Sequence, residues 1–323
     1  MPKVSVIVPI YGVEKFIGRC AESLFAQTLD DIEFIFIDDC TPDESMKILN
    51  AVIEKNRPRF AGKSWTVRTV RMPANSGQAA VRRHGIQLAT GQFVIHCDSD
   101  DWVEPDAYQL MYEKAVKEEL DIVQCDYYRS DGTSKTLYKS GYEGLTEKED
   151  YFRQLLTYRG FTSIWSKMVR KSLYTENEIM YPQENMWEDF ALSVQLFYYA
   201  KRIGLVLEPL YYYFTNPASI SYSNIDKRQS QLMKNSQLIL DFLVSQGLME
   251  KYADEIVFFK YMSRSELVVY TGDKNILRLW RKTYPEVNKT FWRCNEFDFK
   301  EKVKFVSIYL GLYKFFYKVK YSA

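Results

Sequence analysis

The sequence lacks the features that most readily assign a chain to a special protein class. Its five cysteines are scattered, without a Cys-x-x-Cys pair or zinc-ligand spacing, so neither a disulfide scaffold nor a zinc site is expected. It has no run of about 18 uninterrupted apolar residues, which a membrane-spanning helix would need. The net charge is only +1, so no overall field attracts nucleic acid. We therefore expect a cytoplasmic protein with reduced thiols and without a nucleic-acid partner.

The N-terminus and the histidines add little about function. The first three residues are followed at once by an apolar, β-branched run, so we expect a first strand there rather than a signal peptide. His84 and His96 have no carboxylate or cysteine at metal-ligand spacing, and we expect both to be structural or exposed.

What the chain does have is the size and composition of a globular protein. Its 323 residues are 46% apolar and 26% charged, enough for one large domain or two modest ones with a substantial core. The 25 Tyr and 20 Phe indicate aromatic-rich packing or sugar-facing surfaces.

The most informative stretch runs from Phe93 to Trp102. An apolar, strand-like run stops there at Asp98-Ser99-Asp100-Asp101. Ligands of open α/β sheets bind beyond the carboxyl ends of strands, and adjacent carboxylates repel one another unless a partner offsets the repulsion. Hard divalent cations such as Mg²⁺ prefer carboxylate oxygens. The alternative is a polar turn that caps the next helix, and the spacing alone leaves both interpretations open.

Strand and helix patterns alternate over the first part of the chain. The patterns predict strands at 4–10, 32–37, 65–70, 93–97 and 121–127, and helices at 14–27, 41–55, 78–88 and 105–118. This alternation predicts an α/β fold with a mostly parallel central sheet. Because each polar loop follows a strand, we expect Asp38, Asp39 and the 98–101 acids to share one edge of the sheet.

The second part of the chain changes character. Helices are expected at 148–156 and 188–199, a strand at 164–169, and two short β pieces within 204–214, split by Pro209. The polar stretch 132–142 has no clear periodicity. Beyond 215 the pattern is helical only. We therefore expect a catalytic domain over 1–215 and a helical C-terminal extension over 216–323, with the boundary in the Ser- and Asn-rich stretch 216–224.

Four stretches fall in the order and spacing of one known family: 4–11, 36–43, 75–91 and 98–101. Together they resemble the family 2 glycosyltransferases of bacterial surface-polysaccharide assembly, over about residues 3–215. The resemblance implies a GT-A fold that binds a nucleotide sugar, a divalent metal (Mn²⁺ or Mg²⁺), and transfer of the sugar from UDP to an acceptor hydroxyl with inversion.

The resemblance also assigns the nucleotide end of the donor site. Pro9, Tyr11 and Glu14 match the loop that contacts the nucleotide, with Tyr11 against the uracil ring. Asp39 matches the acid that accepts a hydrogen bond from N3–H of the base, and Asp38 supports it. The alternative is that Tyr11 lies at the edge of the core and that both acids cap the following helix.

The diphosphate end is assigned in the same way. Arg82 matches the arginine that approaches the diphosphate, where a guanidinium can pair bidentately with phosphate. Val81 and Arg83 depart from the family's alanine and asparagine at these positions, and the second arginine keeps positive charge nearby. The alternative is an exposed helix arginine paired with solvent.

The resemblance assigns the metal site to the acids at 98–101. Asp100 would bind the ion directly, and Asp98 would contact the ribose or a metal-bound water, with Ser99 between them in the donor site. Asp101 is expected to support the others or to cap a helix. The ion would bridge the phosphates and stabilise the charge of the departing nucleoside diphosphate.

The acceptor side is assigned to two segments. Asp189, in Trp187-Glu188-Asp189, matches the general base that an inverting transfer needs opposite the leaving group. The alternative is that Glu188 and Asp189 complement the dipole of the next helix. Trp165 and Lys167 also resemble the acceptor side, but Trp165 and Trp187 are equally compatible with a place in the core.

The C-terminal segment 300–320 carries six Lys and one Glu among apolar residues. It could contact the inner face of the cytoplasmic membrane, near a glycan or lipid-linked acceptor, or pack as a final helix with its lysines in solvent. The Gln-x-x-Arg-Trp signature of polymerising relatives is missing, which favours addition of a single sugar.

Two competing functions remain open from the sequence. A nucleotidyltransferase would also use an α/β domain with a carboxylate-bound metal, but the loop at 9–12 has one glycine where a glycine-rich phosphate loop is expected. A binding module that holds a nucleotide sugar without turnover is the non-enzyme alternative, and the acids named above argue against it.

Overall fold

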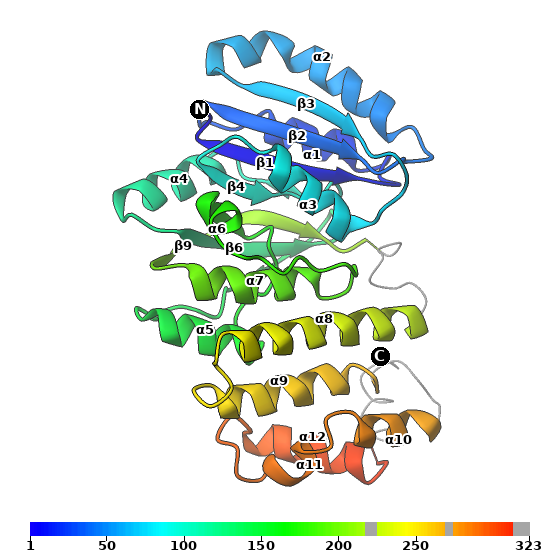
Figure 1. The fold of residues 1–323 in the computed structure, drawn as a ribbon. Coiled ribbons are helices and arrows are strands. Elements are labelled where there is room, and N and C mark those ends of the chain that lie inside the picture. Colours follow the sequence, from blue (N-terminus) through cyan, green and yellow to red (C-terminus); the bar gives the residue numbers. More distant parts are fainter. Residues whose placement is uncertain (217–224, 269–273, 313–323) are drawn as a thin grey trace.

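The computed structural model describes residues 1–216, 225–268 and 274–312 (Figure 1). An α/β unit forms one end of the molecule, and stacked helices form the other. Most of the expected boundary stretch and the last part of the basic tail, 217–224 and 313–323, lie outside the described residues.

The central sheet is built from strands of both orientations. They are β1 (Val4–Ile10), β2 (Ile32–Asp38), β3 (Thr66–Arg71), β4 (Phe93–His96), β5 (Trp102–Val103), β6 (Ile122–Ser130), β7 (Lys135–Tyr138), β8 (Lys167–Arg170) and β9 (Ile203–Phe214). Their order is β3-β2-β1-β4-β8-β6-β9-β5, with β7 paired to β6. β1 to β4 are parallel, whereas β8 lies antiparallel between β4 and β6. The expected α/β fold with a mostly parallel sheet is confirmed.

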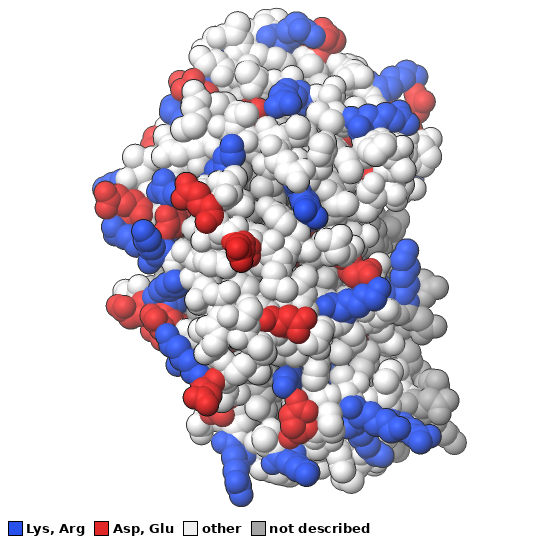
Figure 2. All heavy atoms as spheres, viewed as in Figure 1, with Lys and Arg blue, Asp and Glu red and all other residues white. Residues whose placement is uncertain are grey.

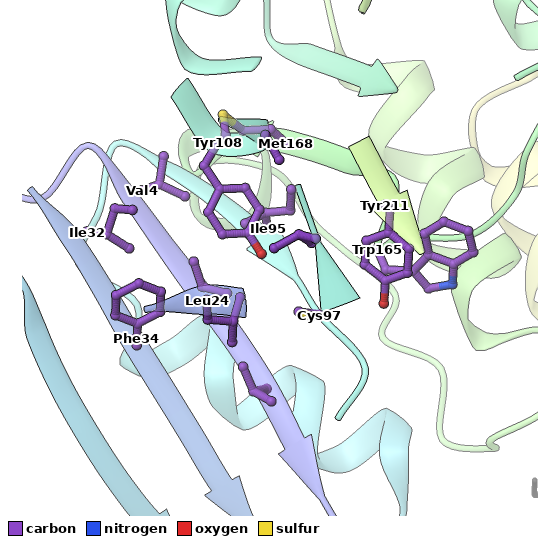
Figure 3. Close-up of a cluster of buried hydrophobic side chains, with 14 of the residues drawn as sticks. Val4, Leu24, Ile32, Phe34, Ile95, Cys97, Tyr108, Trp165, Met168 and Tyr211 are labelled. Atoms are coloured by element: carbon purple, nitrogen blue, oxygen red, sulfur yellow. The ribbon is translucent and has the colours of Figure 1, made fainter. Parts of the chain in front are cut away.

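Helices cover both faces of this sheet. The first set is α1 (Ile17–Leu24), α2 (Ser45–Lys63), α3 (Gln78–Leu88), α4 (Ala107–Lys117), α5 (Lys148–Leu156), α6 (Ser172–Thr175) and α7 (Glu188–Tyr199). α1, α2 and α4 bury their apolar residues against one face, and α3, α5 and α7 against the other. Figure 3 shows part of the first cluster, where Tyr108 of α4 lies near Ile95 of β4.

The alternation of side chains explains the unbroken apolar runs of the inner strands. Val6 and Val8 of β1 point into the cluster under α1, whereas Ile7 points into the one under α3. A parallel strand covered on both faces reads as a continuous apolar run for this reason.

Several boundaries differ from the sequence expectation. α2 begins at Ser45 and continues through Pro58 to Lys63, past the expected end near residue 55. The polar stretch 132–142 contains β7, because it folds back on β6. The two pieces expected around Pro209 form the single strand β9, whose register against β6 shifts near Asp126. A bulge there accommodates a residue that cannot donate to the sheet.

The chain after residue 224 is helical where it is described, as expected. Its helices are α8 (Ile225–Ser245), α9 (Ala253–Ser265), α10 (Lys274–Lys282), α11 (Val287–Thr290) and α12 (Phe299–Tyr309). α8 and α9 share one apolar cluster with α5 and α7, and α9 to α12 form a further cluster. In the part of the chain that the structure describes, no helix is long and apolar enough to cross a membrane. All five cysteines lie in that part and are free thiols.

Candidate active site

The acidic loops lie at one edge of the sheet, as expected. β2 and β4 flank β1 in parallel, so the residues that follow them emerge on the same side. The Asp39 amide donates to the Ile10 carbonyl at 3.0 Å, which joins the loops after β1 and β2. The expectation that Asp39 and the acids at 98–101 share an edge is therefore confirmed.

Asp39 organises the loop before α3. It is 4% exposed, and its two carboxylate oxygens accept hydrogen bonds from the amides of Ser76 (2.7 Å) and Gly77 (2.9 Å). Asp38 accepts from the Thr41 amide at 2.7 Å and so fixes the turn that follows β2. These hydrogen bonds fix the backbone of the loop before α3 and of the turn after β2.

The loop after β1 is the open part of this edge. Tyr11 is 49% exposed and stands directly after Pro9 and Ile10 at the end of β1. The Glu14 carboxylate accepts from the Glu44 amide at 3.1 Å, so it ties this loop to the start of α2. Tyr11 thus presents an accessible ring directly after Ile10, whose carbonyl accepts from the Asp39 amide.

Asp98 and Asp100 differ in their partners. The Asp98 carboxylate accepts from the Arg82 guanidinium at 2.6 Å and from Gln78 Nε2 at 3.1 Å. The Asp100 carboxylate accepts from Asn216 Nδ2 at 3.2 Å. Burial, and then the charge of Asp98, raise the pKa of Asp100. A cation at Asp100 would offset this repulsion.

Asp101 is part of the supporting framework. It is 1% exposed and accepts from the Tyr211 hydroxyl (2.6 Å) and the Phe214 amide (2.7 Å). The Tyr211 oxygen in turn accepts from the Asp98 amide at 3.1 Å. Trp165 stacks on Tyr211 with ring centroids 4.3 Å apart (Figure 3). Trp165 is therefore buried behind the acid cluster, and Tyr211, which was not identified from the sequence, holds both acids.

Arg19 supports the same loop from α1. Its guanidinium lies 3.7 Å from the Trp102 ring centroid and 4.7 Å from that of Phe214, and it donates to the Asp100 carbonyl at 2.9 Å. Ser99 is buried at 6% exposure. Arg19 was not identified either, since nothing in its own helix distinguishes it from a surface arginine.

Arg82 joins Asp98, after β4, to the two acids at the start of α7. It lies on α3, is 3% exposed, and pairs with Asp98 (2.6 Å), Glu188 (3.0 Å) and Asp189. Although burial opposes its charge, these carboxylates raise its pKa. It is not the exposed helix arginine considered as the alternative. Three acids from two distant segments are gathered around a single guanidinium.

Glu188 and Asp189 begin α7. Burial, and then the charge of Asp189, raise the pKa of Glu188 to about 8. Burial also raises the pKa of Asp189, against the opposing effect of Arg82. The second oxygen of Asp189 accepts from the Ile164 amide at 3.1 Å. Trp187, in a left-handed conformation (φ +64°), precedes them. Glu188 and Asp189 therefore do more than complement the dipole of α7. Both contact Arg82 of α3, and Asp189 also contacts the Ile164 amide.

Of the other residues predicted to face the acceptor, Trp165 and Lys167 are buried, whereas Trp187 is partly buried. Lys167 is fully buried and donates to the carbonyls of Phe161 (2.8 Å) and Ser163 (2.6 Å). Burial lowers its pKa to about 7. It holds the segment that presents the Ile164 amide to Asp189. The Trp187 ring stacks on Tyr158 at 5.6 Å. Contact of these side chains with an acceptor stays a prediction.

The acid cluster suits a hard cation. Across residues 1–216, 225–268 and 274–312, no three His, Cys, Asp or Glu side chains group closely enough to hold an ion. Asp98 and Asp100 nevertheless offer carboxylate oxygens at a sheet edge, and Mg²⁺ is commonly bound through one or two carboxylates plus substrate phosphates. The residues present therefore fit an ion that shares its coordination with a bound diphosphate.

A mostly parallel sheet carries acids at its carboxyl edge, and an arginine joins one of them to a second acidic segment, which agrees with the GT-A fold expected from the sequence. The family model described as glycosyl transferase family 2 matches residues 5–176. The chain belongs to that family.

Two relatives come from Bacillus subtilis (strain 168). EpsH is 31% identical over 80% of this chain and 74% of its own length. EpsJ is 31% identical over 68% of this chain and 63% of its own length, so the chain spans less than two thirds of EpsJ.

A third relative is TarS of Staphylococcus aureus (strain Mu50), named as a poly(ribitol-phosphate) β-N-acetylglucosaminyltransferase. It is 25% identical over 80% of this chain and 43% of its own length. The crystal structure of TarS 1–349 with UDP-GlcNAc superposes with a TM-score of 0.59, 17% identity, and coverage of 90% of this chain and 92% of that one. This likeness confirms the GT-A fold.

Proposed function

We propose that the protein transfers a single sugar from a UDP-sugar to an acceptor hydroxyl with inversion, in the assembly of a cell-surface polysaccharide. The observation that carries this proposal is the Arg82 cluster, which joins Asp98 at the donor edge to Asp189 on the acceptor side. The relation to TarS, named as a poly(ribitol-phosphate) β-N-acetylglucosaminyltransferase, supports a role in polymer assembly.

The donor nucleotide would lie along the edge formed by β1, β2 and β4. The exposed Tyr11 ring suits stacking on uracil, with Pro9 and Glu14 shaping the same loop. Asp39 offers acceptor oxygens to N3–H of the base, because each carboxylate oxygen has two lone pairs and uses one on the 76–77 amides. Asp38 fixes the turn next to it. The TarS complex with UDP-GlcNAc supports a UDP-sugar as the donor.

A divalent ion, Mn²⁺ or Mg²⁺, would be held by Asp100, with Asp98 and the nearby Ser99 beside the ribose and phosphates. When bound, it would supply positive charge to the departing diphosphate. Arg82 adds a second positive charge behind Asp98, and its predicted approach to the diphosphate requires that it give up one of its carboxylates.

The transfer itself would use Asp189. The acceptor oxygen forms its bond to the anomeric carbon as the bond to UDP breaks, and its proton passes to the Asp189 carboxylate. The Ile164 amide and Arg82 fix the orientation of that carboxylate. Trp165 and Lys167 support these contacts from inside the protein, and Trp187 with Glu188 lies at the start of the same helix.

UDP release from a panel of UDP-sugars tests this proposal, with simple sugar and lipid-linked sugar acceptors and with Mn²⁺ or EDTA. We expect acceptor-dependent UDP release that EDTA abolishes, and a product of inverted anomeric configuration by NMR. If UDP binds with Mn²⁺ and no acceptor releases it, a nucleotide-sugar-binding module without turnover becomes the better description.

We also propose that the protein works at the inner face of the cytoplasmic membrane, on a glycan or lipid-linked sugar. α10 to α12, with the residues between them, contain nine basic and four acidic side chains. Figure 2 shows basic side chains at this end of the molecule. Phe299, Val303 and Leu310 are exposed (82%, 42% and 61%) and share one face of α12, while Phe305 and Ile308 are buried in the core.

Co-sedimentation with phosphatidylglycerol vesicles tests the membrane contact. The double variant Phe299→Ser/Leu310→Ser should lose most of its vesicle binding, because both changes remove apolar side chains from that face. Leu207→Ser, on β9 and also 61% exposed, is the matched control and should bind as the wild type does. Equal vesicle binding by all three proteins would remove the membrane proposal.

A further inference from the structure

The segment just before the acidic start of α7 is held by the C-terminal helical region. Asn235 of α8 is 1% exposed, and its Nδ2 donates to the carbonyls of Glu184 (2.8 Å) and Met186 (2.7 Å). Both amide hydrogens of one side chain are thus used on two backbone carbonyls of the same short segment. Next to it, Lys234 Nζ pairs with the Glu184 carboxylate at 2.5 Å.

The same segment is also held by the first turn of α3. Asn185, which stands between Glu184 and Met186, accepts a hydrogen bond at its Oδ1 from the Ala79 amide at 3.1 Å. It lies so close to Gly77 that a Cβ on that glycine would come within 2.5 Å of Asn185 Nδ2. The first turn of α3 has free amides, and Asn185 satisfies one of them from a distant part of the chain.

These contacts affect the acids of α7. The residue after the 184–186 segment is Trp187, which takes a left-handed conformation (φ +64°) and is followed by Glu188 and Asp189 at the start of α7. A non-glycine residue holds this conformation only where its surroundings impose it. The contacts of Asn235 and Asn185 supply that constraint, because they fix the backbone on the N-terminal side of the turn.

We propose that Asn235 is a positioning residue for sugar transfer, acting on Asp189 through the backbone of 184–187. The inference rests on the proposed function, in which Asp189 is the base. It gives the C-terminal helical region a part in catalysis: α8 sets where the acceptor-side helix begins, while the nucleotide end of the site, built on the loops after β1 and β2, makes no contact with Asn235 among the hydrogen bonds of the described residues.

Asn235→Asp is the sharpest test. The change keeps the shape of the side chain, removes both N–H donors and places carboxylate oxygens against two carbonyl oxygens. We expect kcat for transfer to fall by about ten- to a hundred-fold, since small misplacements of a reacting group cost this much. The affinity for UDP in Mn²⁺ should stay within about two-fold, because the nucleotide loops are untouched. Asn235→Ala, which introduces no buried charge, is the second variant and should behave in the same direction.

Ser236→Ala is the matched control. Ser236 neighbours Asn235 on α8, is fully buried, and donates to the Leu232 carbonyl at 2.9 Å within its own helix. Its loss removes a buried hydrogen bond without touching the 184–187 segment. We expect wild-type kcat and wild-type UDP affinity from this variant.

Hydrogen exchange gives a readout that does not need an acceptor. In Asn235→Asp and Asn235→Ala the amides of 184–189 should exchange faster than in the wild type, while those of α1 and α2 stay unchanged. If these amides exchange faster in the variants while the wild-type protein transfers no sugar, the result would support the holding of the 184–187 segment by Asn235. It would then count against the proposed function alone. Unchanged exchange, unchanged kcat, or a parallel loss of kcat and UDP affinity in the Asn235 variants would overturn the inference.

Discussion

At the scale of single residues, Arg82 is the cation that three acids of the site share. They are the buried Glu188 and the partly buried Asp98 and Asp189. Removing one member of a buried ion pair leaves an uncompensated charge, which costs more than the pair itself contributes.

Arg82→Gln should therefore lower the free energy of unfolding by about 3–5 kcal/mol. Urea denaturation at neutral pH measures this change. The neighbouring Arg83→Gln is the control, since Arg83 is exposed and faces Tyr181 at 5.0 Å. Equal stability of both variants would mean that the acids near Arg82 do not depend on its charge.

Glu188 should make the stability of the protein depend on pH. Its pKa is raised from 4.5 to about 8 in the folded chain, so the folded state holds a proton that the unfolded state releases. This stabilisation is complete below about pH 4.5 and is lost as the pH rises towards 8. Glu188→Gln, which stays neutral, should flatten the fall in unfolding free energy between pH 5 and 8. Glu178→Gln, an exposed acid, should not change the slope; equal slopes in all three proteins would contradict the assignment.

The sequence predicted the acids but not the residues that hold them. Asp39 and Asp98 stand at strand ends and Asp189 in the first turn of a helix, and the resemblance to the family, more than local spacing, singled them out. Tyr211 and Asn235 act through tertiary contacts with segments about 113 and 50 residues away, which no local pattern encodes. Trp165 and Lys167 were placed on the acceptor side and lie buried behind it, because burial depends on the packing of β9 and α7 around them.

At the scale of elements, the start of α3 is where the donor edge and the acceptor-side segment meet. Gly77 has φ +82° and its amide binds Asp39, while Asn185 packs against its α-carbon. A side chain at this position would meet both a strained backbone and the Asn185 side chain.

Gly77→Ala should therefore be more damaging than a change at another left-handed glycine. Gly12 has φ +67° with open space around a Cβ, so Gly12→Ala should cost about 1–2 kcal/mol of stability from conformation alone. Gly77→Ala should cost about 1–3 kcal/mol more, because its backbone (φ +82°, ψ 162°) lies in a region that essentially only glycine adopts and because Asn185 must move. Thermal denaturation of both variants gives the comparison, and equal losses would contradict this expectation.

The elements themselves were largely predictable, and the exceptions have physical causes. α3, α5 and α7 occupy the predicted ranges, since their apolar periodicity is uninterrupted. Two predicted ranges differ from the structure near a proline. α2 continues through Pro58 because the preceding turns are already anchored, and β9 absorbs Pro209 in a register shift against β6. Local preference was overridden by packing in both cases.

At the scale of the whole molecule, the helical region is continuous with the core. Ile239, Phe242 and Leu243 of α8 and Phe259 of α9 are buried in the same cluster as Phe190 and Leu196 of α7. The division of the chain into a catalytic domain over 1–215 and a helical extension over 216–323 remains a prediction. Both parts contribute side chains to this one cluster.

A chain that ends at residue 216 should not be stable alone. Its α5 and α7 would expose the apolar face that α8 and α9 cover. We expect it to be recovered largely as aggregate, and any soluble fraction to unfold at a lower temperature than the full chain, by scanning calorimetry. A soluble 1–216 chain with the full chain's unfolding temperature would show that the helical region is an independent addition.

In the proposed function Asp100 and Asp189 have different roles: Asp100 holds the ion at the leaving nucleotide, and Asp189 accepts the proton of the acceptor hydroxyl. Asp100→Asn and Asp189→Asn keep the shape of each side chain, and calorimetric titration with UDP in Mn²⁺, followed by a transfer assay, measures both activities. We predict that Asp100→Asn loses the Mn²⁺-dependent part of UDP binding. Asp189→Asn should bind UDP as the wild type does and transfer about 10²–10⁴-fold more slowly. Equal loss of UDP binding in the two variants would contradict the division of roles.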